Sequence, residues 1–159
     1  MTLSEQLKSM HACSEAVEWV GRKKIKTAWR DCPHGDWMLW LAARLDIDRK
    51  LIVLAACDCA ETALQYVPEG EDRPAKAIQT SRNWCEGTAT IEEIRDAAHA
   101  AHAAADAAYA AYAADAAHVA HAAADAGKKA HQTCADLVRK RITVEIIAEA
   151  LKGRIKEAA

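Results

Sequence analysis

The chain has 159 residues, a formal net charge of −2 at pH 7 and a sequence pI near 6.4. This length fits one domain with a hydrophobic core, and the charge argues against the overall basicity typical of proteins that bind nucleic acids directly. The longest strongly apolar run, residues 51–57, is too short to cross a bilayer, and the first ten residues show no apolar signal segment. We therefore expect a cytoplasmic protein with no membrane association and with six cysteines that remain free thiols.

The first third of the sequence alternates helical segments with turn signals. Hydrophobic residues at helical spacing predict a first helix over residues 3–22. A short helix at 27–31 and a Cys-Pro-His-Gly turn at 32–35 follow. Asp36 is well placed to cap the next helix, which the apolar spacing extends to residue 45. Four of the five tryptophans lie in this region, and we expect them to fill the core: Trp19, Trp29, Trp37 and Trp40.

The middle of the chain contains the clearest loop. Before this loop, residues 48–65 are apolar on almost every side, which predicts the central core helix. The loop itself, residues 66–74, holds a glycine and two prolines. Pro74 suits the first turn of the next helix, which we expect to end at Gly87. No segment alternates polar and apolar residues as a strand would, so the pattern favours an all-α fold.

Alanine dominates the following segment, about residues 90–126. Thr90 and Glu93 form a capping-box pattern at its start, and alanine has the highest helix propensity of any residue. We expect a long helix with a break near Gly127, and a last helix over residues 144–156. The sequence as a whole predicts a single-domain multi-helix bundle over residues 1–159.

A polar pattern, Asp-x-x-His/Tyr-x-x-His/Tyr, occurs three times in the alanine-rich segment. Its polar residues step mainly by three, so they drift around the helix, which argues against an ice-binding face or a straight coiled coil. Histidines at this spacing suit a shared metal ion. A cysteine or Glu-x-x-His partner is missing, however, so we favour ordinary polar positions and expect no metal or cofactor. Alanine also lets helices approach closely, which favours a homo-oligomer.

Motifs of common enzymes are missing from the sequence, including the phosphate-binding loop, the dinucleotide fingerprint and the serine-nucleophile elbow. Cys57 and Cys59 would point about 200° apart on a helix, and Cys32-Pro-His34 supplies at most two metal ligands. We therefore expect a protein that is not an enzyme. A binding site is predicted to use charged and aromatic side chains: Asp36, Trp37, Arg44, Glu69, Glu71, Asp72, Arg73, Tyr109 and Tyr112. For the charged residues among them, the alternative is a structural role in helix capping and salt bridges.

An ordered series of motifs runs along the chain: A-C-x-E-A-x-x-W at 12–19, A-W-x-x-C at 28–32, G-D-W-M-L-W-L-A-A-R-L at 35–45, A-C-x-C-A at 56–60 and V-P-E-G-E-x-R-P at 67–74. In this series, and in the alanine-rich segment after it, the chain resembles the immunity proteins related to immunity protein five. The resemblance implies an all-helical binder of the kind found in bacterial polymorphic-toxin loci and on phage genomes, without established catalytic residues. The chain departs from the pattern by carrying His where the alanine-rich segment often has Tyr.

Two functions from different classes follow from these observations. The first is a non-enzymatic helical protein that neutralises a toxin or a defence component by stoichiometric binding, in an immunity or phage counter-defence role. Exposed acids such as Glu69, Glu71 and Asp72 would then steer the capture of a basic nuclease toxin. The alternative is an oligomeric sponge that sequesters a nucleotide-like immune signal. Trp37 or Tyr109 would stack on a base, and Arg44 or Arg73 would hold phosphate.

Overall fold

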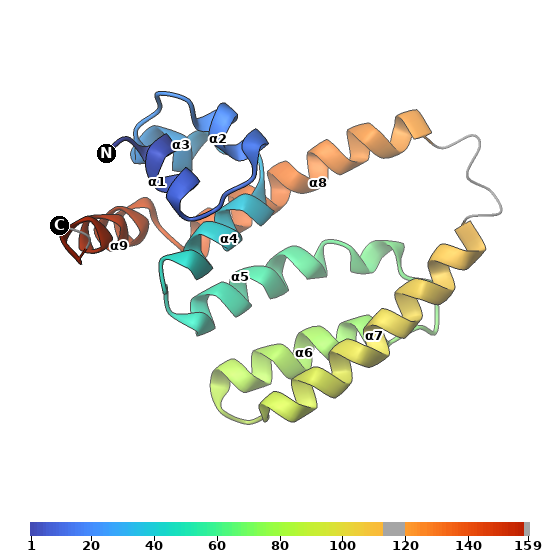
Figure 1. The fold of residues 1–159 in the computed structure, drawn as a ribbon. Helices are drawn as coiled ribbons and strands as arrows, with labels where there is room; N and C mark the ends of the chain where they lie inside the picture. The colour runs from blue at the N-terminus through green and yellow to red at the C-terminus, as the bar shows by residue number, and fades with distance from the viewer. Residues whose placement is uncertain (113–119, 158–159) are drawn as a thin grey trace. The chain divides into compact units, whose positions relative to one another are not determined.

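The computed structural model describes the backbone of residues 1–112 and 120–157, and the side chains of this range except those of 102–112, 120–127 and 155–157. Every regular element in these residues is a helix, which confirms the all-α prediction (Figure 1). The chain divides into two compact units, which we describe separately. The terminal unit comprises Met1–Ile52 and His131–Ala159, and the central unit comprises Val53–Ala130. The single domain over residues 1–159 stays a prediction.

Two short helices open the terminal unit where the sequence predicted one. α1 spans Leu3–Ser9 and α2 spans Ser14–Val20, so the prediction of a continuous helix over residues 3–22 was wrong. The chain turns between them at His11, which has a positive φ of 64°. This turn lets both helices bury apolar side chains, whereas a continuous helix would have followed one straight axis.

The next two helices flank the predicted turn. α3 spans Ile25–Asp31 and α4 spans Gly35–Arg44, close to the predicted ranges. The prediction that Asp36 caps α4 was wrong, because His34 occupies the N-cap position and Asp36 lies in the first turn. A carboxylate in the first turn still interacts favourably with the positive end of the helix dipole.

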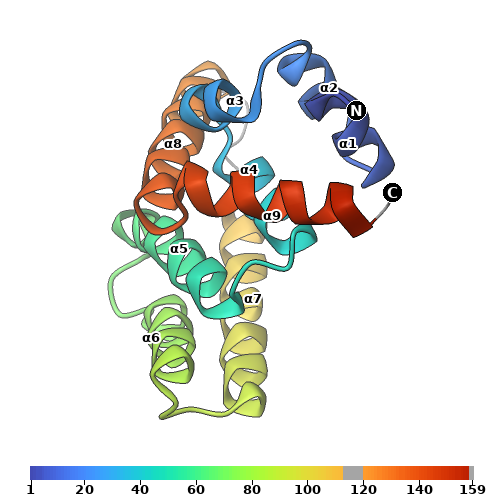
Figure 2. The same cartoon turned by 90° about the vertical axis from the view of Figure 1, so that its left-hand side faces the viewer.

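The core of the terminal unit is formed by side chains of α4 and of the last two described helices. α8 spans Ala120–Arg141 and α9 spans Val144–Glu157, which begins where the sequence predicted the last helix (Figure 2). The largest fully buried side chains among the described residues are Met38, Val138, Ile142 and Ile147. Trp29 packs beside them with 4% of its surface exposed, and its indole Nε1 donates a hydrogen bond to the Ile142 carbonyl over 3.1 Å. This confirms the core role predicted for Trp29.

In the central unit, α5 (Arg49–Glu61, entering from the terminal unit) and the 3₁₀ turn η1 (Leu64–Tyr66) precede a helical hairpin. α5 does not have the burial predicted for a core helix, because Ala55 and Cys57 are its buried residues. Its last turn is tightened by Thr62, whose hydroxyl donates to the Cys59 carbonyl over 2.7 Å. Bonding of this local kind ends the helix before residue 65.

The hairpin of the central unit consists of α6 (Arg73–Glu86) and α7 (Ile91–Tyr112), which run side by side in opposite directions (Figures 1 and 2). Pro74 lies in the first turn of α6, and Gly87 ends that helix with a left-handed φ of 81°, as predicted. At the start of α7 the Thr90 hydroxyl accepts a hydrogen bond from the backbone of Glu93, which confirms the capping box.

The alanine-rich segment is helical on both sides of the undescribed residues 113–119. The prediction of a break near Gly127 was wrong, because α8 continues through this residue. A glycine inside a helix lowers the stability of the helix by only about 1 kcal/mol relative to alanine, and the packing of the rest of α8 outweighs this loss. Most side chains of the polar repeat lie outside the described residues, so its role in self-association stays a prediction.

Candidate functional site

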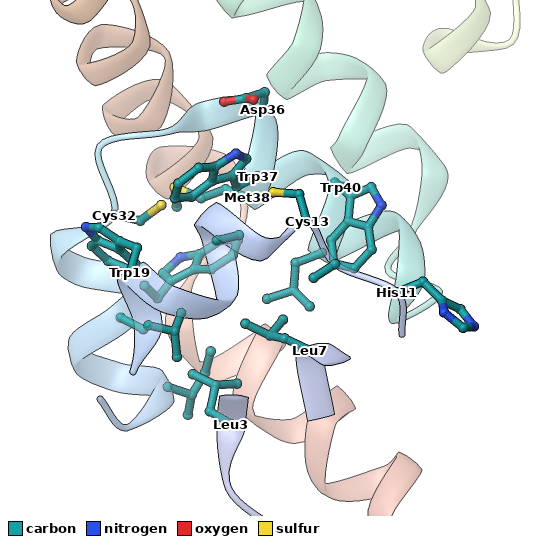
Figure 3. Close-up of a pocket in the computed structure, with 17 residues that line it drawn as sticks. Leu3, Leu7, His11, Cys13, Trp19, Cys32, Asp36, Trp37, Met38 and Trp40 are labelled. Carbon is teal, nitrogen blue, oxygen red and sulfur yellow. The ribbon is translucent and has the colours of Figure 1, made fainter. Parts of the chain in front are cut away.

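A tryptophan-rich cavity of about 540 Å³ lies within the terminal unit (Figure 3). Helices α1 to α4 all contribute to its lining, which is mostly apolar. Leu3 and Leu7 of α1 lie on one side of the cavity, and Trp37 and Trp40 come from α4. A concave apolar site of this size is typical of a pocket for a small ligand or for an apolar side chain of a partner.

The tryptophans of the cavity are held by aromatic and cationic neighbours. The rings of Trp19 and Trp37 meet edge to face, with their centroids 6.3 Å apart. The Lys23 ammonium lies 4.3 Å from the centroid of the Trp19 ring, and the Arg44 guanidinium lies 5.6 Å from that of Trp40. Cation–π attraction therefore gives Arg44 a local partner on its own helix.

The lining of the cavity contains few charged groups. Among the described residues that form it, Asp36 at the edge contributes a carboxylate and His11 an imidazole, and no lysine or arginine is present. The thiol of Cys32 faces the same space, and burial raises its pKa above the ordinary cysteine value. Because the thiolate is the reactive form, Cys32 is poorly suited to nucleophilic chemistry. The lining suits an apolar or cationic group better than a phosphate.

The start of α4 is fixed tightly against α8. A Cβ atom added to Gly35 would come within 2.7 Å of the Cys134 Cβ and 2.9 Å of the Ala135 backbone nitrogen, so only glycine allows this approach. Arg139 of α8 donates hydrogen bonds to two carbonyls on the other side of the turn, at Trp29 and Cys32, the first over 2.9 Å. These contacts set the position of the residues next to Gly35.

Two histidines converge on one carboxylate beside Gly35. The Nδ1 atom of His34 lies 3.8 Å from Oδ1 of Asp36, and the Nδ1 atom of His131 lies 3.5 Å from the same oxygen. The His34 ring also stacks on Trp37 with a centroid distance of 3.9 Å and an interplanar angle of 23°. Among the described residues, these three form the one group with the spacing of a metal site.

Two of the three predicted acids of the central unit, Glu71 and Asp72, form ion pairs with neighbouring cations. Glu71 forms an ion pair with Arg73, and this hydrogen-bonded pair lowers the pKa of Glu71 from 4.5 to about 2. Asp72 pairs with Lys76 over 2.7 Å, while Glu69 is exposed. The salt-bridge alternative for Glu71, Asp72 and Arg73 therefore describes their local structure.

A second ion-pair network in the central unit joins α5 to α6. One guanidinium nitrogen of Arg82 lies 2.8 Å from a carboxylate oxygen of Asp58 and 2.8 Å from one of Glu61. The Arg82 side chain is 20% exposed, so these contacts are partly shielded from water. This network is a structural link between the two helices.

The structure brings together few of the predicted site residues. Asp36 and Trp37 are neighbours at the edge of the cavity, and Arg44 lies at the other end of the same helix. The four predicted residues from Glu69 to Arg73 lie in the other unit. Tyr109 and Tyr112 belong to α7, but their side chains lie outside the described residues.

Sequence reasoning missed two members of the cluster around Asp36. His34 was considered only with Cys32, whose thiol instead donates to the His34 carbonyl over 3.5 Å. His131 comes from α8, nearly a hundred residues later, so no local spacing connects it with Asp36. The glycine between His34 and Asp36 was the one local signal of a close approach.

The described residues define an all-helical protein with a mostly apolar cavity in its terminal unit. A family model described as "Imm-5 like putative immunity protein" matches residues 45–142, more than half of the chain. The chain therefore belongs to this immunity protein family, which indicates a toxin-neutralising role and is typically non-enzymatic. No curated protein and no solved structure shows a significant match. Among the described residues, none of the helices combines the length and hydrophobicity needed to span a membrane.

Proposed function

We propose that this protein neutralises a basic protein toxin by stoichiometric binding, without catalysis, and that the central unit provides the main recognition surface. Family membership supports the toxin-neutralising part of this proposal. The charge distribution supports the recognition of a basic partner. A protein that acts by masking its target needs a complementary surface rather than a reactive group.

The distribution of charge between the two units is the observation that carries the proposal. The central unit contains 12 Asp and Glu against 6 Lys and Arg, a formal charge of −6, whereas the terminal unit contains 11 against 15, a formal charge of +4. The small net charge of the whole chain conceals this separation. An acidic surface raises the rate at which a basic partner is captured, and the effect falls with increasing ionic strength.

Within the central unit, the turn between α6 and α7 offers stronger acidic character than the loop before α6. We define the acidic turn patch as the exposed residues Glu86, Glu92 and Asp96. In the loop, by contrast, the carboxylates of Glu71 and Asp72 already face cationic partners. The acidic turn patch should therefore contribute more to steering than the loop does.

The proposal is tested with toxins encoded beside genes for this chain, each produced as an inactive variant. Charge reversal of the acidic turn patch, as the triple variant Glu86→Lys, Glu92→Lys and Asp96→Lys, should lower the association rate constant at least tenfold at low salt. Reversal of Glu15 and Glu18, two exposed acids of the terminal unit, is the matched control and should change the rate little. Equal rates for the wild type and the triple variant would contradict the recognition surface. Failure of every neighbouring toxin to bind would contradict the function itself.

The cavity favours this proposal over a nucleotide sponge. A nucleotide-like signal carries phosphate, which needs cationic or backbone donors. The described lining includes Asp36 and His11 but no lysine or arginine. Of the two arginines predicted to hold phosphate, Arg44 lies over the ring of the lining residue Trp40, and Arg73 is paired with Glu71. Native mass spectrometry of the purified protein tests this choice, because a retained nucleotide-sized mass would favour the sponge.

A further inference from the structure

We propose that His34, Asp36 and His131 form a binding site for one transition-metal ion of the zinc type. The ion would join the start of α4 to α8 within the terminal unit. This inference does not depend on the proposed toxin-binding function, because all three ligands lie in the terminal unit and the acidic recognition surface lies in the central unit.

The geometry is close to that of a tetrahedral centre. With metal–ligand bonds of about 2.0–2.1 Å, neighbouring ligand atoms of a tetrahedral zinc site lie roughly 3.3 Å apart. The two Nδ1–Oδ1 distances to Asp36, 3.5 Å from His131 and 3.8 Å from His34, are slightly longer. All three ligand atoms lie within 4.8 Å of one another. Small side-chain rotations would bring them to coordination distances.

The chemistry of the donor set selects the class of ion. Two imidazole nitrogens and one carboxylate oxygen favour Zn²⁺, Co²⁺ or Ni²⁺, whereas Mg²⁺ and Ca²⁺ prefer sets of oxygen ligands. Three protein ligands leave the fourth tetrahedral position to water or to a group from a partner. The side chains are 34% exposed at His34, 58% at Asp36 and 51% at His131, so solvent reaches this position.

The backbone keeps the three ligands together before any ion binds. His34 and Asp36 flank Gly35, whose contact with the α8 backbone at Cys134 and Ala135 leaves no room for a side chain. His131 precedes Cys134 and Ala135 by one helical turn, and so it lies on the same face of α8 as they do. Stacking of His34 on Trp37 restricts one imidazole further. A site with restricted ligands loses less conformational entropy when it binds its ion.

Isothermal titration of the untagged, chelator-treated full-length protein with ZnCl₂ tests the proposal. We expect one equivalent of Zn²⁺ to bind to the wild type. His131→Ala and Asp36→Asn should each weaken this binding at least about tenfold, since the loss of a group that merely supports a ligand already costs 10–100-fold. His99→Ala removes an exposed histidine of α7 in the other unit and should leave the affinity unchanged.

Cysteine ligation is the competing explanation for any zinc binding, because the chain has six cysteines. The absorption spectrum of the Co²⁺-loaded protein separates the two, since thiolate ligands add charge-transfer bands in the near ultraviolet. We expect the visible bands of a tetrahedral nitrogen and oxygen site without the thiolate bands. Absence of binding, thiolate bands, or unchanged affinity in both His131→Ala and Asp36→Asn would overturn the proposal. Far-ultraviolet circular dichroism checks that each variant is folded.

Discussion

Replacement of Gly35 by alanine tests the close approach between α4 and α8. The new Cβ would lie 2.7–2.9 Å from the Cys134 Cβ, the Cys134 carbonyl carbon and the Ala135 nitrogen, two of which are backbone atoms that cannot rotate away. Overpacking of this kind typically costs about 1–3 kcal/mol. The higher helix propensity of alanine returns at most about 1 kcal/mol. With an overpacking cost near the middle of this range, about 2 kcal/mol, we expect Gly35→Ala to lower the free energy of unfolding by about 1–2 kcal/mol.

Gly153 in α9 provides the matched control for this substitution. A Cβ added there meets no heavy atom within 4 Å among the described residues. Gly153→Ala should therefore raise the stability by roughly 0.5–1 kcal/mol, through the lower conformational entropy of the unfolded chain. Urea unfolding followed by circular dichroism measures both variants. A Gly35→Ala protein as stable as the wild type, or equal effects of the two substitutions, would refute the close approach between α4 and α8.

Three further predictions concern single interactions. Trp29→Phe removes the indole donor from the buried Ile142 carbonyl and should cost about 1–3 kcal/mol in urea unfolding; an unchanged midpoint would contradict this role. Arg82→Met removes the cation that Asp58 and Glu61 of α5 share, and it should lower the free energy of unfolding by about 1–3 kcal/mol. The same substitution should have little effect in a protein in which both acids have been replaced by amides. The pKa of Glu71, followed by NMR, should be about 2 in the wild type and should return towards 4.5 in Arg73→Ala. The stabilisation that this ion pair provides should be present above pH 4.5 and should be lost as the pH falls through 2. A Glu71 pKa that is unaffected by Arg73→Ala would contradict the ion pair.

The helices predicted most accurately from the sequence were those with a chemical signal at their ends. Pro74, Gly87 and the Thr90 capping box marked α6 and α7 correctly, because each acts through bonds or dihedral angles within a few residues. The break between α1 and α2 has no such signal. His11 adopts the left-handed conformation of a helix C-terminal turn, in which the backbone N–H groups of His11 and Ala12 donate to the carbonyls of Lys8 and Leu7. Glycine is the usual residue at such a position, so a histidine gives no warning of the turn.

The candidate site was less predictable because it depends on contacts between distant parts of the chain. His131 reaches Asp36 through the approach of α8 to Gly35, which spacing in the sequence does not reveal. The acids of the loop before α6 stay a predicted surface for a partner, and the structure adds that Glu71 and Asp72 are paired with nearby cations.

The most direct test of the central claim is a titration of toxin activity with the purified protein. A stoichiometric binder lowers the activity linearly with its molar amount, reaches full neutralisation at a fixed ratio, and gives the same result after short and long incubation. We predict this behaviour for a toxin encoded beside the gene. Neutralisation by much less than one equivalent that increases with time would show turnover, and would contradict a role based on binding alone.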